Sequence, residues 1–500
     1  MAVLEHFSIL PEAYTADPMI RALPPLAVEA IVCAIGWRIF AGALRSLKQG
    51  KVTSGFLTML LCLVTLLDTA LYAFLPARAA LSLPLPVLGA MSVYCALLGE
   101  SLRLHGMYDT FRIAAIGNAP YIVTVTAGGA AKRVGLPGGF SNSARANDPY
   151  SRWQSVLLPV FLAAAVVFGV LSTLETKQNA LLAWNLSVML ASANLLAFPM
   201  VCALPLKRIA AIHDLSGLGK CFSGADAIRR SNCVILTDGD LFPPGTVTLG
   251  GLKVFGEESG KVISYAATMA HASESGLSRL FDNLLARDGG FREQVEDVDF
   301  YEEGGVGGRI HGETVLFGTA GFMRKRGVNL PRNLGLKTGV FLSVDGTLIA
   351  VFAVKYMPAE NVDWALHALH HSRITPVLAV RDGNITPALL KRKFGTDARA
   401  VYPKLSTRLA LSERGGRPYA LLMREGLMPY AEVVLGSKRL CASAKRCTVL
   451  AFLAATASTL LAFYLTFVGA YSVLTPFSLL IYVLLWSLSA LVDALLSDRY

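Results

Sequence analysis

Two aspartates follow a short apolar segment that has the composition of a buried strand. Cys233–Leu236 is followed by Thr237, then by Asp238-Gly239-Asp240 and a Pro-Pro-Gly turn. A carboxylate at a strand end can act as a nucleophile or, with further oxygen ligands, hold a hard cation such as Mg²⁺. The alternative is a strand-end turn whose charges are solvated. Both interpretations stay open at this point.

The segments that would position these aspartates alternate between apolar strands and amphipathic helices, which predicts a parallel α/β architecture. Further strands are expected at 340–344, 348–354, 375–380 and 419–423, and helices at 264–286, 360–371 and 387–394. About 100 residues separate the first strand from the next ones. This insert contains a run of glycines between 304 and 318, which favours a small second lobe built from tight hairpins.

The rest of the chain is apolar enough to lie in a membrane. Of its 500 residues 54% are hydrophobic and 16% are charged, and the mean hydropathy is +0.51, which excludes an ordinary soluble enzyme. A helix needs about 20 apolar residues to cross the hydrocarbon layer. Seven spans are predicted, at 24–45, 56–76, 83–103, 154–174, 180–206, 447–467 and 471–496.

Basic residues predict the orientation of these spans. The net charge is +11, and Lys and Arg gather in the connections after the first, third and fifth spans. Such an excess marks cytoplasmic loops of a membrane protein rather than nucleic-acid binding. We therefore expect an integral protein of the plasma or cell membrane, with the lipid bilayer as its partner and no nucleic acid. The 207–446 segment and the C-terminus are expected in the cytoplasm.

Three stretches carry a resemblance to a known family. Gly305–Gly318 (GVGGRIHGETVLFG) is similar to the nucleotide-lobe pattern G-V-x-G-x-V-x-G-x-x-V-x-V-G of P-type ATPases that transport heavy metals. Gly219–Ile228 resembles the stretch that joins the membrane core of these proteins to their phosphorylation strand. Lys355–Glu360 stands where they have D-x-x-R-P-E. The layout of spans and insert resembles the same branch.

The resemblance implies a haloacid-dehalogenase-like, Rossmann-type α/β domain that carries an inserted α+β nucleotide-binding-like lobe. Its parts would be N-terminal membrane helices at 1–103, a short cytoplasmic loop at 104–153, two membrane helices at 154–206, the α/β domain at 207–245 and 346–446, the inserted lobe at 246–345, and two C-terminal membrane helices at 447–500. The loop at 104–153 is too short for the family's actuator domain and lacks its T-G-E-S motif.

The catalytic motifs of the family are altered in this chain. The family phosphorylates the Asp of D-K-T-G-T-L-T, and a gap-free alignment places Thr237 at that position. Moving the register by one residue makes Asp238 the nucleophile and Asp240 the acid/base. The metal-binding G-D-G-x-N-D of the family corresponds to a stretch in which Glu425 is the carboxylate. Asp238, Asp240 and Glu425 would then hold Mg²⁺, and the alternative for Glu425 is a solvated charge. The family's T-G-D-N corresponds to Arg381-Asp382-Gly383-Asn384.

The resemblance also implies a nucleotide site and a transport site. Nucleotide binding would involve Ser273 and Glu274, where the adenine-contacting His of S-E-H-P-L is missing, and the glycines Gly305, Gly307, Gly312 and Gly318. The alternative role of these glycines is hairpin geometry. For transport, Pro199, Met200 and Cys202 replace the family's Cys-Pro-Cys. Met and Cys are soft ligands, although in a spanning helix they more often only pack.

Two hypotheses follow. The first is a catalytically degenerate member, a pseudo-ATPase that keeps the scaffold and acts in regulation, sensing or assembly with a membrane protein partner. It rests on the simultaneous alteration of five sites. The second is a divergent active ATPase that couples ATP hydrolysis to metal ion transport, or a membrane-anchored phosphatase. ATP and Mg²⁺ would be its cofactors, whereas the first hypothesis requires none.

Overall fold

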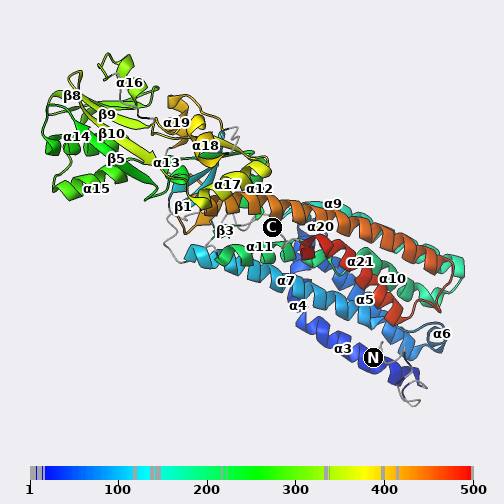
Figure 1. Ribbon diagram of the computed structural model, residues 1–500. Coiled ribbons are helices and arrows are strands. Elements are labelled where there is room, and N and C mark those ends of the chain that lie inside the picture. The colour runs from blue at the N-terminus through cyan, green and yellow to red at the C-terminus, as the bar shows by residue number, and fades with distance from the viewer. Residues whose placement is uncertain are drawn as a thin grey trace. The chain divides into compact units, whose positions relative to one another are not determined.

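The computed structural model describes residues 7, 9, 14, 17–115, 121–135, 140, 148–215, 218–220, 222–331, 336, 338–395, 400–412 and 416–496. The chain divides into two compact units. The helical unit comprises Met1–Phe111, Arg145–Ile212 and Arg439–Tyr500, and the α/β unit comprises Arg112–Ala144 and His213–Lys438. Figure 1 labels the elements of both.

Within the described residues, seven helical segments are long and apolar enough to cross a membrane, as the sequence predicts. The helices are α3 (Pro18–Ile35), α4 (Trp37–Lys48), α5 (Ser54–Phe74), α6 (Pro76–Ala79), α7 (Pro86–Ala115), α9 (Pro149–Thr176), α10 (Leu182–Ala193), α11 (Ala203–Leu215), α20 (Leu427–Phe467) and α21 (Pro476–Leu496). The fifth segment, Asn179–Ala210, contains both α10 and α11 and is the most buried, with 83% of its apolar window inside the protein.

The first span differs from the prediction. It begins at Pro18, where the Asp17 side chain accepts a hydrogen bond from the Met19 N–H (2.9 Å), and it ends at Ile35 instead of continuing to residue 45. A Cβ atom at Gly36 would lie 2.4 Å from a Val93 methyl carbon, so the glycine permits a close approach to α7. The separate helix α4 follows this break.

The first lobe of the α/β unit is built on a mixed six-stranded sheet with the order β11-β4-β2-β1-β12-β3. Its strands are β1 (Tyr121–Thr126), β2 (Gly129–Val134), β3 (Leu218–Lys220), β4 (Cys233–Leu236), β11 (Thr375–Leu378) and β12 (Ala420–Leu422). Only β11 and β2 run parallel to β4. The helices are α12 (Phe222–Arg230), α13 (Asp238–Leu241), α17 (Glu360–His371), α18 (Pro387–Phe394) and α19 (Leu405–Leu411).

The hairpin β1–β2 was not predicted. It comes from the 104–153 segment, and it inserts between β4 and β12. Ala130 and Ala131 of β2 pair with Val234 and Ile235 of β4. The turn expected at Thr126–Gly129 joins the two strands, whereas the turn expected at 137–139 lies outside the described residues.

The second lobe is an antiparallel six-stranded sheet with the order β5-β10-β9-β8-β7-β6. The strands are β5 (Val247–Val254), β6 (Glu296–Tyr301), β7 (Gly305–Ile310), β8 (Glu313–Gly318), β9 (Gly339–Val344) and β10 (Thr347–Tyr356). The boundary expected after residue 345 falls between β9 and β10, which pair with each other. The strands expected at 340–344 and 348–354 therefore belong to this antiparallel sheet and not to a parallel one.

Helices cover both faces of the second sheet. On one face α14 (Ser259–Ala272) and α15 (Ser278–Asp288) pack over β7, β8 and β5, and α16 (Ala320–Lys325) lies on the other face (Figure 1). Successive residues of a strand point to opposite faces. Val351 accordingly belongs to the small core under α16, whereas Ala350 and Phe352 belong to the main core.

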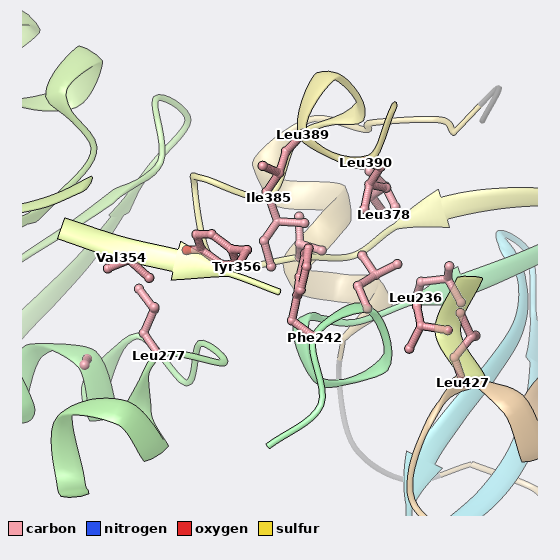
Figure 2. Close-up of a cluster of buried hydrophobic side chains, with 14 of the residues drawn as sticks. Leu236, Phe242, Leu277, Val354, Tyr356, Leu378, Ile385, Leu389, Leu390 and Leu427 are labelled. Atoms are coloured by element: carbon pink, nitrogen blue, oxygen red, sulfur yellow. The ribbon is translucent and has the colours of Figure 1, made fainter. Parts of the chain in front are cut away.

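The two lobes share this main core. Figure 2 shows Leu277 and Val354 of the second lobe near Tyr356, with Phe242, Ile385 and Leu389 of the first lobe beyond it. The Phe242 and Tyr356 rings pack edge to face with their centroids 5.0 Å apart. Burial of such side chains is the main source of stability in folded domains, so the lobes stabilise one another.

Candidate functional site

Asp238 lies at the junction of the two lobes. Strand β4 ends at Leu236, Thr237 caps the short helix α13, and Asp238 is the first residue of that helix. Its carboxylate accepts hydrogen bonds from three backbone N–H groups, those of Gly276 (2.9 Å), Arg381 (3.1 Å) and Asp382 (3.3 Å). The residue is 6% exposed.

A second buried carboxylate faces Asp238. Burial, together with the charge of Asp382, raises the pKa of Asp238 to about 7, although the three backbone N–H groups act against this shift. Burial also raises the pKa of Asp382, whose carboxylate accepts a hydrogen bond from the Tyr356 hydroxyl. The pair therefore exchanges a proton near neutral pH.

Asp240 points away from this pair and is fully buried. One of its oxygens accepts hydrogen bonds from the Thr237 N–H (3.0 Å) and from the Thr237 hydroxyl (2.8 Å). The other forms an ion pair with the Lys132 ammonium group, which comes from strand β2. Lys132 also lies over the Tyr121 ring, 5.0 Å from its centroid. Asp240 is thus a helix cap with its own counter-ion.

Sequence reasoning missed Lys132, because its role depends on the pairing of β2 with β4. The alternating apolar and β-branched residues Tyr121–Thr126, followed by Gly128-Gly129, are a hairpin signature that could have indicated these strands. The sequence holds no local indication that the hairpin joins this particular sheet, since the partner strand lies about 100 residues further along the chain.

Glu425 is separated from Asp240 by this insertion. It follows β12, and the hairpin β1–β2 lies between β12 and β4. Its side chain is 39% exposed and lies 3.6 Å from the Arg279 guanidinium. Asp238, Arg381, Arg279 and Glu425 line a cavity of about 790 Å³, which we call the Asp238 cavity.

The expected Mg²⁺ site does not fit this arrangement. Mg²⁺ takes oxygen ligands in a nearly octahedral set, but Asp240 is paired with Lys132, Asp238 is occupied by backbone N–H groups, and Glu425 pairs with Arg279. Across the described part of the chain, no group of three or more His, Cys, Asp or Glu side chains could hold a metal ion. The structure does not bring the three carboxylates together as metal ligands.

Ser273 and Glu274 lie in a turn that closes onto Asp238. The single helix expected at 264–286 is divided here into α14 and α15, and Glu274 has a positive φ of 47°. The Ser273 hydroxyl donates to the Ala270 carbonyl (2.7 Å). The Glu274 carboxylate lies 2.9 Å from the Arg381 guanidinium. Both side chains therefore have partners within the protein.

The glycines of the 305–318 stretch have structural roles. A Cβ at Gly305 would lie 2.1 Å from the Phe322 ring, and one at Gly318 would lie 2.5 Å from the Gly305 Cα. Gly312, with φ of 85°, forms the turn between β7 and β8, and a Cβ at Gly307 would touch Leu316 at 3.1 Å. These contacts agree with the hairpin alternative.

The crevice between these glycines and the 273–277 turn is almost filled. The cavity lined by Ser273, Gly305, Gly318 and Asp382 measures about 30 Å³, which is the volume of about one water molecule. Gly304 of the second lobe also meets Gly383 of the first, since a Cβ at Gly304 would lie 2.6 Å from the Gly383 Cα. A nucleotide does not fit in this crevice as it stands.

The expected transport residues lie at a break in the fifth membrane segment. Pro199 and Met200 are in a single 3₁₀ turn (Phe198–Met200) between α10 and α11, and Cys202 is 6% exposed. A Cβ at Gly99 of α7 would lie 2.5 Å from the Pro199 Cβ, so α7 packs directly on the break. Phe198 packs against Tyr150, with ring centroids 5.7 Å apart.

The fold therefore combines membrane-spanning helices with a two-lobed α/β unit, and the solved structures to which it is similar are zinc- and copper-transporting P-type ATPases. One is a zinc-transporting PIB-type ATPase in the E2·Pi state, with 11% identity over 96% of this chain and 100% of that chain and a TM-score of 0.48. A second structure of a zinc-transporting PIB-type ATPase, in the E2·P state, has 14% identity over 94% and 95%, with a TM-score of 0.48. The N-domain of the copper transporter HMA8 has 19% identity over 21% and 98%, with a TM-score of 0.19. No family model matches the chain, and no curated protein matches it.

Proposed function

We propose that the chain is an integral membrane, P-type-ATPase-like protein that does not hydrolyse ATP and acts as a regulatory, sensing or scaffold protein. The observation that carries this proposal is the ion pair between Lys132 and the buried Asp240. An ammonium group beside this carboxylate supplies a fixed positive charge where a metal-dependent phosphotransferase needs a divalent cation. Asp240 is then a structural cap and not an acid/base.

The closed crevice supports the same proposal. Transfer of a phosphoryl group to Asp238 would require a nucleotide between the lobes, and about 30 Å³ of space is left there. The backbone approach of Gly304 to Gly383 and the shared main core favour the closed form. Opening it would expose buried apolar surface, which costs free energy.

The orientation of the protein belongs to the proposal as well. Basic residues such as Arg45, Lys48, Lys207 and Arg208 flank the first and fifth spans on one side. On this basis we place the α/β unit and the C-terminus in the cytoplasm of a cell whose plasma membrane holds the helices. A protein partner in the same membrane would receive the regulatory output.

One observation favours the second hypothesis, a divergent active ATPase or membrane-anchored phosphatase. Asp238 lines the Asp238 cavity together with Arg279 and Arg381, so its carboxylate faces a space large enough for a small phosphorylated substrate. Asp238 would then be the nucleophile. Such an enzyme would still need a cation that its own carboxylates, as arranged, do not bind.

ATP hydrolysis by the purified full-length protein in lipid nanodiscs separates the two. We expect no Mg²⁺-dependent hydrolysis above that of the Asp238→Asn variant. Asp282→Asn is the matched control, since Asp282 pairs with Arg292 on α15. Hydrolysis that is present in the wild type and in Asp282→Asn but absent in Asp238→Asn would refute the pseudo-ATPase proposal and establish Asp238 as the nucleophile.

A further inference from the structure

A second large cavity lies on the opposite side of the second sheet from α14 and α15. It has a volume of about 480 Å³ and is lined by residues of α16, of α18 and of the loop that contains Gly383 and Asn384. Figure 1 shows α16 on this side of the sheet, away from α14 and α15. The volume is within the range of small-molecule sites.

The charged residues of this cavity are all basic. Arg324 of α16 and Arg392 of α18 line it, and its described lining includes no Asp or Glu. Neither guanidinium has a hydrogen bond or an ion pair with any other described residue, and both side chains are exposed. We call this site the two-arginine cavity. The Asp238 cavity differs, because there Arg381 and Arg279 are paired with Glu274 and Glu425.

The two arginines come from different lobes. Arg324 belongs to the second lobe, and Arg392 belongs to the first. Gly383, which also lines the cavity, is in backbone contact with Gly304 where the lobes meet. A ligand that engaged both guanidinium groups would therefore bridge the lobes and hold them together.

We propose that the two-arginine cavity binds a multivalent phosphate and that this ligand clamps the two lobes in their closed arrangement. A guanidinium group presents a planar set of donors that matches phosphate oxygens, and it keeps its charge at all physiological pH values. Two unpaired arginines facing one cavity repel each other, and an anion between them removes this repulsion. The apolar side of the cavity, with Leu330 and Phe341, would contact any uncharged part of the ligand.

The test measures binding of tripolyphosphate, without divalent cations, to the full-length protein in nanodiscs of zwitterionic lipid. We expect saturable binding that raises the melting temperature, since a ligand of the folded form stabilises it by mass action. Arg324→Gln and Arg392→Gln should each weaken binding at least about tenfold, because hydrogen bonds to charged groups contribute at least that factor. Both variants should melt like the wild type without ligand.

Arg287→Gln is the matched control. Arg287 is an exposed arginine on α15, on the other face of the sheet, so this variant has the same net charge as the two test variants. Binding that is absent in the wild type, that is unchanged in Arg324→Gln and Arg392→Gln, or that is lost equally in Arg287→Gln would overturn the proposal.

A second arm identifies the source of the phosphate. Nanodiscs that contain a phosphoinositide replace added tripolyphosphate, and the melting temperature is compared between wild type and Arg324→Gln. An increase that requires Arg324 supports the site with a lipid headgroup as its ligand. If only tripolyphosphate acts through Arg324, the ligand is a soluble phosphate.

Discussion

The strand-end turn at Asp238 and the helix break at Pro199 both interrupt a regular element, but they differ in what they leave available for chemistry. At the turn, a titratable carboxylate lines a cavity of about 790 Å³. At the break, Pro199 packs against Gly99, and Cys202 is buried. Shape and chemistry can thus be retained separately: the turn keeps a reactive group and the break keeps mainly its backbone geometry.

The largest expected effect concerns Lys132, on which the turn depends. Lys132→Met leaves Asp240 as an unpaired buried carboxylate, which should reduce the free energy of unfolding by about 3–5 kcal/mol. Chemical denaturation of the full chain measures this change. The double variant Lys132→Met/Asp240→Asn should recover most of the loss, because it removes the unpaired charge. Equal stability of wild type and Lys132→Met would mean that the ion pair does not hold the turn.

The next effect compares backbone contacts at the two places. Gly304→Ala places a Cβ 2.6 Å from the Gly383 Cα at φ of 82°, and Gly99→Ala places one 2.6 Å from the Pro199 carbonyl oxygen. Each substitution should cost about 1–3 kcal/mol by overpacking. Melting temperatures report both losses.

Gly239→Ala is the control for these two variants. An added Cβ meets nothing within 4 Å at Gly239, and the residue lies in α13. This change should leave stability equal or slightly higher, since Ala is the better helix former. If Gly304→Ala were as stable as Gly239→Ala, the lobes would not be in the close contact described for the crevice.

The turn should also make stability depend on pH, whereas the break has no such group. Asp238 has a pKa of about 7 in the folded protein, against about 3.9 in an unfolded chain. The folded form binds more protons between these values, so stability rises as the pH falls through 7. From pH 8 to pH 6 the gain should be about 1.4 kcal/mol.

Denaturation at the two pH values checks this sign. Asp238→Asn should remove most of the gain, and Asp282→Asn should keep it. The raised pKa of Asp382 acts in the same direction and accounts for any remainder. A wild-type protein that is less stable at pH 6 than at pH 8 would contradict the burial of this pair.

The smallest effect is expected at the rim of the Asp238 cavity. Arg279 and Glu425 are exposed and 3.6 Å apart, so Arg279→Gln should change stability by less than about 1 kcal/mol. Denaturation at low and high salt measures it. A loss of several kcal/mol would mean that Glu425 belongs to a tighter network than the described contacts.

The sequence predicts elements better than the contacts between them. The seven spans and the strand Cys233–Leu236 depend on local composition, and the helices expected at 360–371 and 387–394 have those bounds in the structure. The pairing of β2 with β4, which brings Lys132 to Asp240, joins segments about 100 residues apart, and local patterns do not encode such a contact. Placing Asp238 at a strand end was possible from sequence, but its N–H donors from Gly276 and Arg381 were not.

The central claim is that Asp238 does not accept a phosphoryl group from ATP. The most direct measurement is acid quenching of the full-length protein after incubation with γ-labelled ATP and Mg²⁺, followed by a search for a hydroxylamine-sensitive phosphoenzyme. The account predicts no label above that of Asp238→Asn, whether or not tripolyphosphate is present. A hydroxylamine-sensitive label on the wild type that is absent from Asp238→Asn would contradict it.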